Sequence, residues 1–285
     1  MKNLLNYLTE LIGETIKTYK PVSGGDISNA FFIETKLNRY FLKVNSQKEA
    51  YSMFLAEKQG LETIEYTQTI ATPKVYHCGQ HKGYSFLLME FVESRTPTSE
   101  DFKSLANQLA GLHKISTSEF GWEQNNFIGS LAQSNKQHKN WTAFYLEERI
   151  FPQLQLAQIK NLLSLNDLPN KQKMYTFCEE FFEDIKPSLV HGDLWSGNFL
   201  IALDGTPYLI DPAVYYGHYE IDIAMSKLFG GFHDSFYRTY QEHFPFSEHT
   251  RTRIDLYQLY YLLVHLNLFG SSYFRNVQRI LLKYF

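Results

Sequence analysis

The segment His191–Asp211, HGDLWSGNFLIALDGTPYLID, constrains this chain more than any other part of the sequence. An Asp follows the His by two residues, an Asn follows that Asp by five, and a second Asp ends an apolar run. Kinases need a carboxylate that orients and deprotonates a hydroxyl, and an Asn and a second Asp that hold magnesium against ATP phosphates. The pattern therefore predicts that Asp193 is the catalytic proton acceptor and that Asn198 and Asp211 are Mg²⁺ ligands, with hard oxygens suited to that ion.

The His-Gly-Asp triplet also indicates the class of kinase. Protein kinases carry H-R-D-x-x-x-x-N, whereas Gly192 stands in the place of the Arg. That Arg pairs with a phosphorylated activation loop in protein kinases, so its absence favours a kinase of small molecules. An ordinary turn would explain His-Gly-Asp alone. It does not explain the further presence of Asn198, the Asp204–Gly205 hairpin signal and the apolar residues before Asp211.

A lysine on an apolar strand is the second element of the pattern. Lys43 lies in YFLKV, the context of a lysine that pairs with the α and β phosphates of ATP. Glu57 lies on the helix predicted next, and such a Lys and Glu form the ion pair that positions ATP. Glu49 is a competing acid, and Glu57 is favoured because it lies further into the helix. A lone strand-end lysine is usually solvated, so the assignment rests on the pair.

Two backbone segments are predicted to contact the nucleotide. Glycines in the turn before the Lys43 strand would let N–H groups approach phosphate oxygens, although this turn is not GxGxxG and a simple hairpin also explains it. The end of the last strand of the first lobe would bind adenine through its backbone, a signal of position only. The residues predicted from these two segments are Gly24, Gly25, Asp26, Ile27, Ser28, Met89, Glu90, Phe91 and Val92.

The order of predicted elements indicates an α+β fold with a small β-rich lobe and a larger helical lobe. The first lobe is predicted to contain helices at 1–13 and 47–64, a strand ending near Pro21–Val22, and strands at 28–35, 40–44, 73–78 and 84–92. The second lobe is predicted to contain helices at 99–115, 141–151, 153–165 and 170–186 and across 220–285, with a long anchored loop at 118–140. We therefore predict an ATP-binding domain at 1–92 and a catalytic and substrate-binding domain at 93–285, the arrangement that a nucleotide cleft requires.

Composition limits the possible partners. With a net charge of −3 and a pI of about 6.4, the chain lacks the basic character of nucleic-acid-binding domains. No apolar run approaches the roughly 18 residues of a membrane span. The two cysteines, Cys78 and Cys178, have no metal-binding spacing and are expected to be reduced thiols. We expect a cytoplasmic protein that uses ATP and Mg²⁺ and binds neither nucleic acid nor membrane, with a monomer favoured.

Several longer motifs resemble those of the fructosamine kinase, or ketosamine-3-kinase, family. They are LVHGDLWSGN, LIDPAVYYG, DIAMSKLFGGF and LLVHLNLFG, together with GGDISNAF, FLKVN, LAEKQGL and FGWEQNNFIGSLAQ. The resemblance covers essentially the whole chain. Aminoglycoside phosphotransferases and choline kinases share HGDxxxxN, but LWSGN followed by DPAxYYG is not typical of them.

The resemblance implies an ATP-dependent kinase with a protein-kinase-like bilobal fold that phosphorylates the 3-hydroxyl of a ketosamine. The product then falls apart and frees the amine, which is deglycation. Ribulosamines and erythrulosamines, small or protein-bound, are expected to be preferred to fructosamines. Trp195 is implied as a sugar-stacking residue. Tyr215, Tyr216 and His265 are interpreted first as packing residues and second as substrate contacts, and Asp222 is predicted to cap its helix or hold the His-Gly-Asp backbone.

The chain departs from the family pattern in two places. After YYG the family usually shows Asp-Arg-Glu, whereas this chain has His218-Tyr219-Glu220, which affects the expected specificity more than the catalysis. Some members have a Cys in the glycine-rich turn, and Asp26 here predicts no redox switch.

Two alternative functions stay open. One is a kinase of the aminoglycoside or choline type. The other is a nucleotide-binding pseudokinase, and the intact kinase residues argue against this second alternative.

Overall fold

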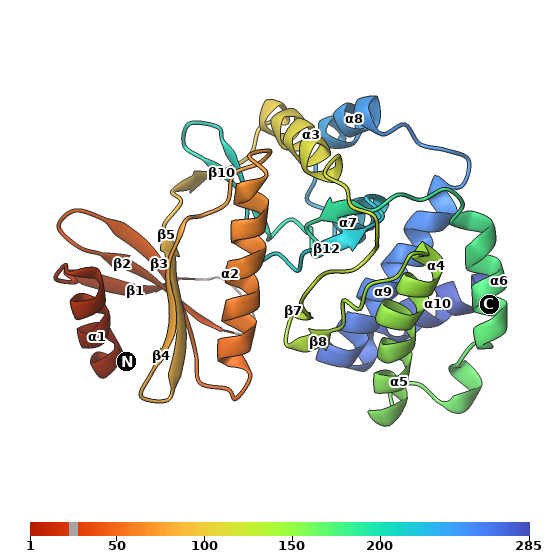
Figure 1. The fold of residues 1–285 in the computed structure, drawn as a ribbon, viewed down its shortest axis with the longest axis horizontal. Helices are drawn as coiled ribbons and strands as arrows, with labels where there is room; N and C mark the ends of the chain where they lie inside the picture. Colours follow the sequence, from red (N-terminus) through yellow and green to blue (C-terminus); the bar gives the residue numbers. More distant parts are fainter. Residues whose placement is uncertain (23–27) are drawn as a thin grey trace. The chain divides into compact units, whose positions relative to one another are not determined.

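The computed structural model describes residues 1–22 and 28–285, and the chain forms two compact units (Figure 1). The first unit comprises Met1–Pro97 with Leu200–Asp211, and the second comprises Thr98–Phe199 with Pro212–Phe285. The sequence placed a single boundary after Val92. Instead, the first unit also takes in Leu200–Asp211, because β10 pairs with β6. The predicted contacts at Gly24, Gly25, Asp26 and Ile27 lie outside the described residues.

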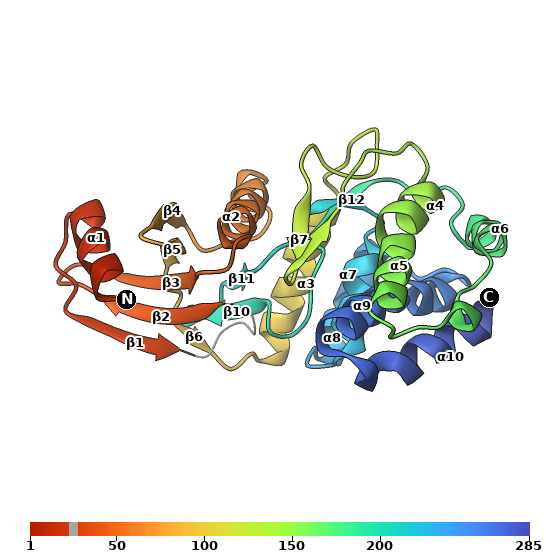
Figure 2. The ribbon, with the colours of Figure 1, turned by 90° about the horizontal axis from the view of Figure 1, so that it is seen from below.

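An antiparallel sheet of five strands, in the order β1-β2-β3-β5-β4, organises the first unit (Figure 2). Its elements are α1 (Lys2–Ile12), β1 (Thr18–Val22), β2 (Asn29–Glu34), β3 (Arg39–Asn45), α2 (Ala50–Tyr66), β4 (Val75–His81) and β5 (Tyr84–Glu90). These positions agree with the predicted helices and strands within a few residues. The first unit is rich in β-sheet and the second is mainly helical, which confirms the predicted α+β class.

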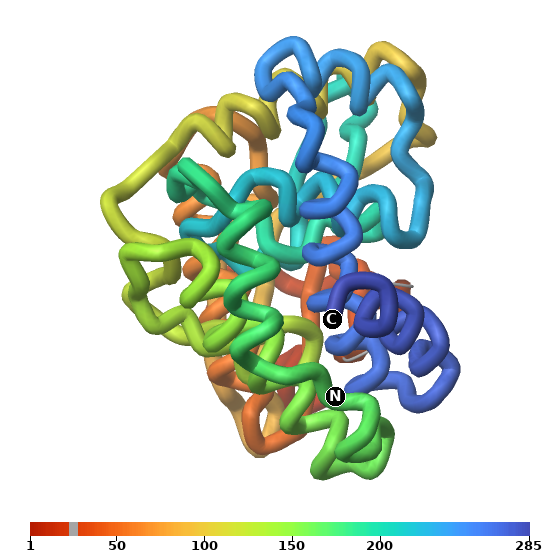
Figure 3. The backbone as a smooth tube through the Cα atoms, turned by 90° about the vertical axis from the view of Figure 1, so that its right-hand side faces the viewer, coloured from red at the N-terminus to blue at the C-terminus, as the bar shows by residue number. Residues whose placement is uncertain are grey.

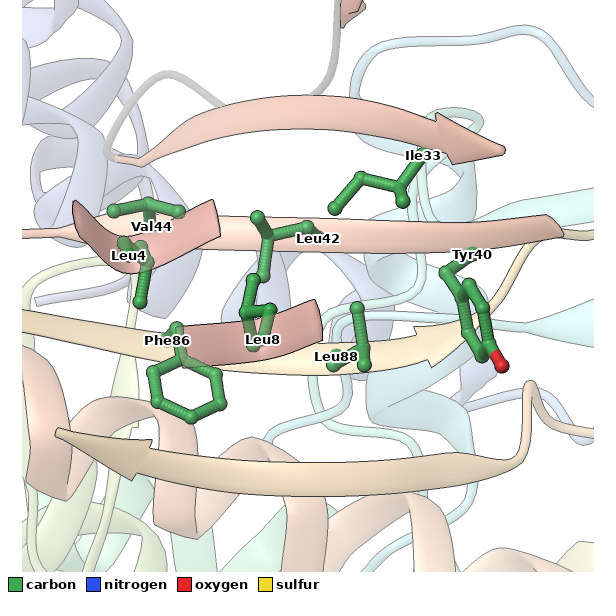
Figure 4. Packing of buried hydrophobic residues seen from close by; sticks show 8 residues of the cluster. All are labelled: Leu4, Leu8, Ile33, Tyr40, Leu42, Val44, Phe86 and Leu88. Carbon is green, nitrogen blue, oxygen red and sulfur yellow. The ribbon is translucent and has the colours of Figure 1, made fainter. Parts of the chain in front are cut away.

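Helix α1 covers one face of this sheet. Leu4 and Leu8 of α1 pack on Leu42, Val44 and other buried side chains of β2, β3 and β5 (Figure 4). Successive strand residues point to opposite faces, so Lys43, between Leu42 and Val44, points away from α1. The α1 face is therefore the apolar support of the strand that carries Lys43.

Helix α2 covers the opposite face. Phe54 and Leu61 of α2 pack on Leu87 and Met89 of β5, and Leu87 is the cross-strand partner of Lys43. Lys43 therefore emerges on the face where α2 lies. The alternation of one strand and the helical spacing of α2 together bring a lysine and a glutamate into reach of each other.

A second, three-stranded sheet completes the first unit. Its strands are β6 (Ser94–Arg95), β10 (Phe199–Ala202) and β11 (Pro207–Leu209). The hairpin predicted at Asp204–Gly205 is present: Asp204 Oδ1 accepts from the Thr206 N–H at 2.9 Å, and Gly205 has φ 93°. Leu209 N donates to Ala71 O at 2.9 Å, which fixes the strand that leads to Asp211.

The second unit is mainly helical, and Figure 3 follows its path to the C-terminus in α10. Its α-helices are α3 (Ser99–His113), α4 (Trp141–Phe144), α5 (Phe151–Ile159), α6 (Lys171–Phe181), α7 (Glu220–Leu228), α8 (Asp234–His243), α9 (Thr250–Phe269) and α10 (Phe274–Tyr284). Short strands are β7 (Asn126–Ile128), β8 (Leu131–Gln133), β9 (Ser188–Val190) and β12 (Tyr215–Gly217). Within residues 1–22 and 28–285, no helix has the length and apolar character needed to span a bilayer.

The second unit differs from the prediction in three places. The segment 118–140 contains the β7–β8 hairpin and is not only a loop. Helices predicted at 141–151 and 153–165 form one run from Trp141 to Ile159, with a π-helical turn at Tyr145–Ile150. Pro152 lies near the start of α5, directly after the π-helical turn, so the helical path changes its winding next to the proline instead of ending there. The sequence also missed β12, which is too short to show alternation.

Candidate active site

Lys43 forms the ion pair that the sequence predicted. Its Nζ lies 2.7 Å from Glu57 Oε1, and it also pairs with Asp211 within the same unit. The structure therefore places Glu57, and not Glu49, beside the lysine. The Lys43 side chain is 10% exposed and lies between the carboxylates of Glu57 and Asp211. A lysine held in this way presents a fixed positive charge.

Asp211 ends the first unit in an unusual backbone conformation. It follows β11 and has φ 54°, in the left-handed region that few residues other than Gly adopt and that Asp tolerates better than most. Uncommon backbone angles of this kind gather at functional sites. The conformation and the ion pair with Lys43 single out Asp211 from Asp204, the other described aspartate of the first unit.

The His191-Gly192-Asp193 turn follows β9, which pairs with β12 in the second unit. Gly192 has φ 85°, and a Cβ atom at this position would clash with the carbonyl oxygen of Ala213. Glycine is thus required here by the backbone. From the sequence alone, Gly192 was notable only because it replaces the Arg of the protein-kinase motif.

Asp222 holds this turn from α7, which confirms the predicted role. Its Oδ2 accepts from His191 N at 2.7 Å and its Oδ1 from Gly192 N at 2.9 Å. His113 Nε2 lies 3.0 Å from Oδ2, and His113 Nδ1 lies 2.6 Å from the Tyr240 hydroxyl. The sequence analysis missed His113, although a His among the apolar residues that end a predicted helix was a detectable signal.

Asp193 carries an ionisable carboxyl group with few stabilising partners. Asn198 Nδ2 donates to Asp193 O at 2.8 Å and to Oδ2 at 3.2 Å. Burial, and then the negative charge of Asp222, raise the pKa of Asp193 to about 7, against a lowering by the Asn198 hydrogen bond. A carboxylate with a pKa near neutrality can accept a proton from a hydroxyl group and release it again.

The donor chemistry of the predicted metal ligands fits magnesium. Asn198 is buried and donates through Nδ2, so its amide oxygen is the atom that would coordinate a metal ion. Asp211 contributes a carboxylate. These hard oxygen donors are those that Mg²⁺ prefers. Asn198 belongs to the second unit and Asp211 to the first.

The predicted adenine segment and Ser28 lie in or directly beside the strands of the first unit. β5 ends at Glu90, whose backbone N donates to Lys74 O at 2.8 Å. Met89 is buried against α2, and the Phe91 ring lies 4.6 Å from that of Phe32. The Ser28 hydroxyl accepts from Asn45 Nδ2 at 3.3 Å. Val92 follows the strand without secondary structure of its own.

The proposed substrate residues divide into buried and accessible groups. Trp195 is 40% exposed, and its indole lies over Gly197, where a Cβ atom would clash with the ring. Tyr216 is half-buried beside Trp122, with 5.5 Å between ring centroids. Tyr215 is fully buried, which agrees with packing as its first interpretation. His265 is partly buried and packs on Phe229 at 4.7 Å.

The residues that depart from the family pattern point into the protein. His218 is buried, with Nδ1 2.8 Å from the Tyr257 hydroxyl. Burial, and then the charges of Arg253 and His113, lower the pKa of His218 well below its usual value, so the ring is neutral. Arg253 forms a buried ion pair with Glu220, with Nε 2.6 Å from Oε2. His218 therefore acts in packing and hydrogen bonding.

Comparison with known proteins agrees with these features. The profile of the fructosamine kinase family matches residues 1–285. The chain belongs to the fructosamine kinase family. A probable ketoamine kinase of Enterococcus faecium is 38% identical over 266 residues, which cover 92% of this chain and 93% of the relative. The chloroplastic protein-ribulosamine 3-kinase of Arabidopsis thaliana is 37% identical over 285 residues, which cover 96% of this chain and 84% of the relative.

A solved structure supports the same assignment. A protein of Haemophilus somnus that is provisionally named a fructosamine-3-kinase superposes with a TM-score of 0.88 at 30% identity, covering 98% of this chain and 96% of the other. As a member of the fructosamine kinase family, the chain is a phosphotransferase with a hydroxyl group as acceptor.

Proposed function

We propose that this ketosamine kinase transfers the γ-phosphoryl group of ATP to the 3-hydroxyl of ketosamines, with ribulosamines and erythrulosamines preferred to fructosamines. The name and similarity of the Arabidopsis ribulosamine 3-kinase support the acceptor class. A phosphate at the 3-position is a good leaving group beside the keto carbon, so the adduct decomposes and the amine is released. The biological role is then deglycation of small amines or of protein lysines.

Asp193 is the residue on which the proposed chemistry depends. Its carboxylate has a pKa of about 7, and Asp222 fixes the turn that carries it. We assign it the role of orienting the acceptor hydroxyl and accepting its proton as the phosphoryl group is transferred. This kind of general base contributes typically about 10²- to 10⁴-fold to a rate.

We assign ATP binding to three parts of the sequence: the Lys43 strand with its partner helix, the strand end at Met89–Val92, and the His191–Asp211 segment. Lys43, oriented by Glu57, contacts the α and β phosphates, and the backbone of Met89–Val92 contacts adenine. Asn198 and Asp211 hold Mg²⁺, which, when bound, neutralises phosphate charge. The ion pair of Lys43 with Glu57 at 2.7 Å supports the first assignment, and the oxygen donor set supports the last.

The acceptor is assigned to the exposed surface beside Asp193. Trp195 lies two residues after Asp193 and exposes 40% of its surface, which suits stacking against a sugar ring. Tyr216 and His265 are assigned as secondary contacts because both are partly accessible. Tyr215 is buried, so its contribution would be to support these residues by packing. A cytoplasmic location and a monomeric state complete the proposal.

The test is ADP release by purified protein with Mg·ATP and ribulose-lysine, fructose-lysine or no acceptor. We expect acceptor-dependent release that is faster with ribulose-lysine than with fructose-lysine, and loss of that release in the Asp193→Asn variant. Release at background with both acceptors, from protein that still binds ATP, would overturn the proposed substrate class. Equal release by Asp193→Asn would remove Asp193 from the chemistry while leaving the substrate class intact.

A further inference from the structure

Residues 118–140, which we call the strap, are tied down along their length. Phe120 N donates to His138 O at 2.8 Å and His138 N donates to Phe120 O at 3.0 Å, so the two ends of the strap pair with each other. Gly121 and Tyr216 of β12 exchange two further backbone hydrogen bonds, each 2.8 Å long. The strap is therefore a fixed part of the second unit, beside the strand that follows the Asp211 motif.

Three buried polar side chains connect the strap to its surroundings. The Tyr260 hydroxyl of α9 donates to Gln133 Oε1. Gln133 Nε2 donates to Asn126 Oδ1 at 2.7 Å, and Asn126 Nδ2 donates to Val214 O at 2.8 Å. Each amide accepts through its oxygen and donates through its nitrogen, so the series runs in one direction from α9 to Val214. We call these three residues the amide relay.

The relay ends where the chain touches the His-Gly-Asp turn. Ala213, the neighbour of Val214, donates its N–H to His191 O at 2.8 Å, and its carbonyl oxygen occupies the space in which a Cβ of residue 192 would lie. The position of this backbone therefore sets the space available to Gly192.

Helix α9 reaches the same turn by a second route. Tyr261, the residue after Tyr260, donates its hydroxyl to Gly192 O at 2.8 Å. Both tyrosines are fully buried, with ring centroids 5.1 Å apart. One tyrosine therefore supports the His-Gly-Asp turn directly and the other supports it through the strap.

We propose that Tyr260, Gln133 and Asn126 are positioning residues that hold Val214, and through it the His-Gly-Asp turn, in the geometry for phosphoryl transfer. The proposal rests on the role assigned to Asp193 under Proposed function. The relay members are buried, so loss of one member leaves its neighbour with an unpaired polar atom that water does not reach. Misplacement of a reacting group by about 1 Å can cost about 10²-fold in rate.

The test is a double-mutant cycle on the relay, read by steady-state kinetics with the best acceptor of the wild-type protein. The variants are Tyr260→Phe, which removes a single oxygen atom, Asn126→Leu, and the two combined. We expect each single variant to lower kcat by about tenfold or more while the KM for ATP stays within about twofold. Since both substitutions break the same series of bonds, the double variant should be little worse than Asn126→Leu alone.

Tyr257→Phe is the matched control. Tyr257 lies on the same helix, is fully buried, and loses hydrogen bonds to Trp141 Nε1 at 3.0 Å and His218 Nδ1 at 2.8 Å, but it is not part of the relay. We expect a loss of thermal stability like that of Tyr260→Phe with kcat within about twofold of wild type, as a hydrogen-bond loss of similar size predicts.

Three outcomes would overturn the relay. They are a kcat of Tyr260→Phe equal to that of wild type, equal losses of kcat in Tyr260→Phe and Tyr257→Phe, and independent effects of Tyr260→Phe and Asn126→Leu. Failure of the proposed substrate class is separately visible, because the wild-type protein itself would then show no acceptor-dependent turnover.

Discussion

The two units hold their reactive charges in opposite ways. In the first unit Lys43 is paired with Glu57 and Asp211. In the second unit Asp193 has no Lys, Arg or His of that unit within ion-pair distance among the described residues, and Asp222 adds a further negative charge nearby. Burial raises the pKa of the Asp193 carboxyl group, and the negative charge of Asp222 raises it further. On the roles proposed above, the difference separates Lys43, which would bind phosphate charge, from Asp193, which would exchange a proton with the acceptor hydroxyl.

The units also differ in how these residues are supported. The first unit supports Lys43 by the apolar faces of one sheet, with α1 on one side and α2 on the other. The second unit holds the His-Gly-Asp turn by hydrogen bonds from Asp222, Tyr261 and the backbone of Ala213. Apolar packing tolerates volume-conserving changes, which usually cost less than about 1.5 kcal/mol, while loss of one member of a buried polar network leaves its partners unpaired at a higher cost. We therefore expect the loss of a single hydrogen-bonding group to affect the His-Gly-Asp turn more than a volume-conserving apolar substitution affects Lys43.

The largest expected effect comes from Asp193→Asn, which removes the proton acceptor but keeps an oxygen for the Asn198 hydrogen bond. We expect kcat to fall at least about 100-fold, the lower range for losing a general base, with a small change in the KM for ATP. Steady-state ADP release measures both constants. Unchanged turnover would end the contrast between the two units, because Asp193 would then have no chemical role.

The next largest effect is expected from Lys43→Met, which removes the paired cation of the first unit. Glu57 and Asp211 are then left near each other without a positive charge, and ATP loses a phosphate contact. We expect kcat/KM for ATP to fall roughly 10- to 100-fold, corresponding to about 1.4 to 2.7 kcal/mol.

Lys58→Met is the matched control for Lys43→Met. Lys58 lies on α2 and pairs with Glu62 at 3.7 Å, with both side chains at least one-third exposed. Exposed pairs of this kind contribute about 0 to 1 kcal/mol, so kinetics and stability should change little. A similar loss in both variants would show that the effect is not specific to Lys43.

The pH dependence of turnover tests the isolated carboxylate. The pKa of Asp193 is about 7, and only the ionised form accepts a proton, so kcat should fall as the pH drops below 7. At pH 6 about one-tenth of Asp193 is ionised, so kcat should be about tenfold lower than its plateau value well above pH 7. The residual rate of Asp193→Asn should lack this decline. A wild-type rate that stays level to pH 5 would contradict the raised pKa.

The smallest effect is expected on stability. The pKa of Asp193 rises from 3.8 to about 7 in the folded protein, so between these values the folded state binds more protons and the wild type loses stability as pH rises. Asparagine imitates the protonated group. Asp193→Asn should therefore melt about 2 to 6 °C higher at pH 8, and the difference should shrink toward pH 4. A lower melting temperature at pH 8 would contradict this account.

Local patterns in the sequence predicted much of the fold and of the site. The strand of Lys43, the helix of Glu57 and the Asp204–Gly205 hairpin each follow from side-chain periodicity or turn chemistry within a few residues. The predicted pairing of Lys43 with Glu57 required only that a strand and the next helix pack together. Asp222 was predicted from its place at the start of a helix, and its contacts with His191 and Gly192 confirm that role.

Residues whose partners are distant in sequence could not be predicted in this way. Gln133 meets Tyr260, which is 127 positions away, and amides in a polar segment are usually solvated. Arg149, in the polar run EERI, suggests an exposed cation. Instead it is fully buried between the rings of Phe144 and Tyr215, at 4.6 and 4.1 Å, and donates to Asn135 Oδ1 at 2.6 Å.

The sequence by itself determined the family and the reaction class and led to the proposed reacting groups, because a kinase needs a small set of side chains at spacings that one strand, turn and helix can supply. The tertiary structure decided the charge state of Asp193, the need for glycine at position 192 and the support of the turn by α9 and the strap. These depend on burial and on hydrogen-bond partners from other elements. Burial and long-range pairing exist only once the chain has folded.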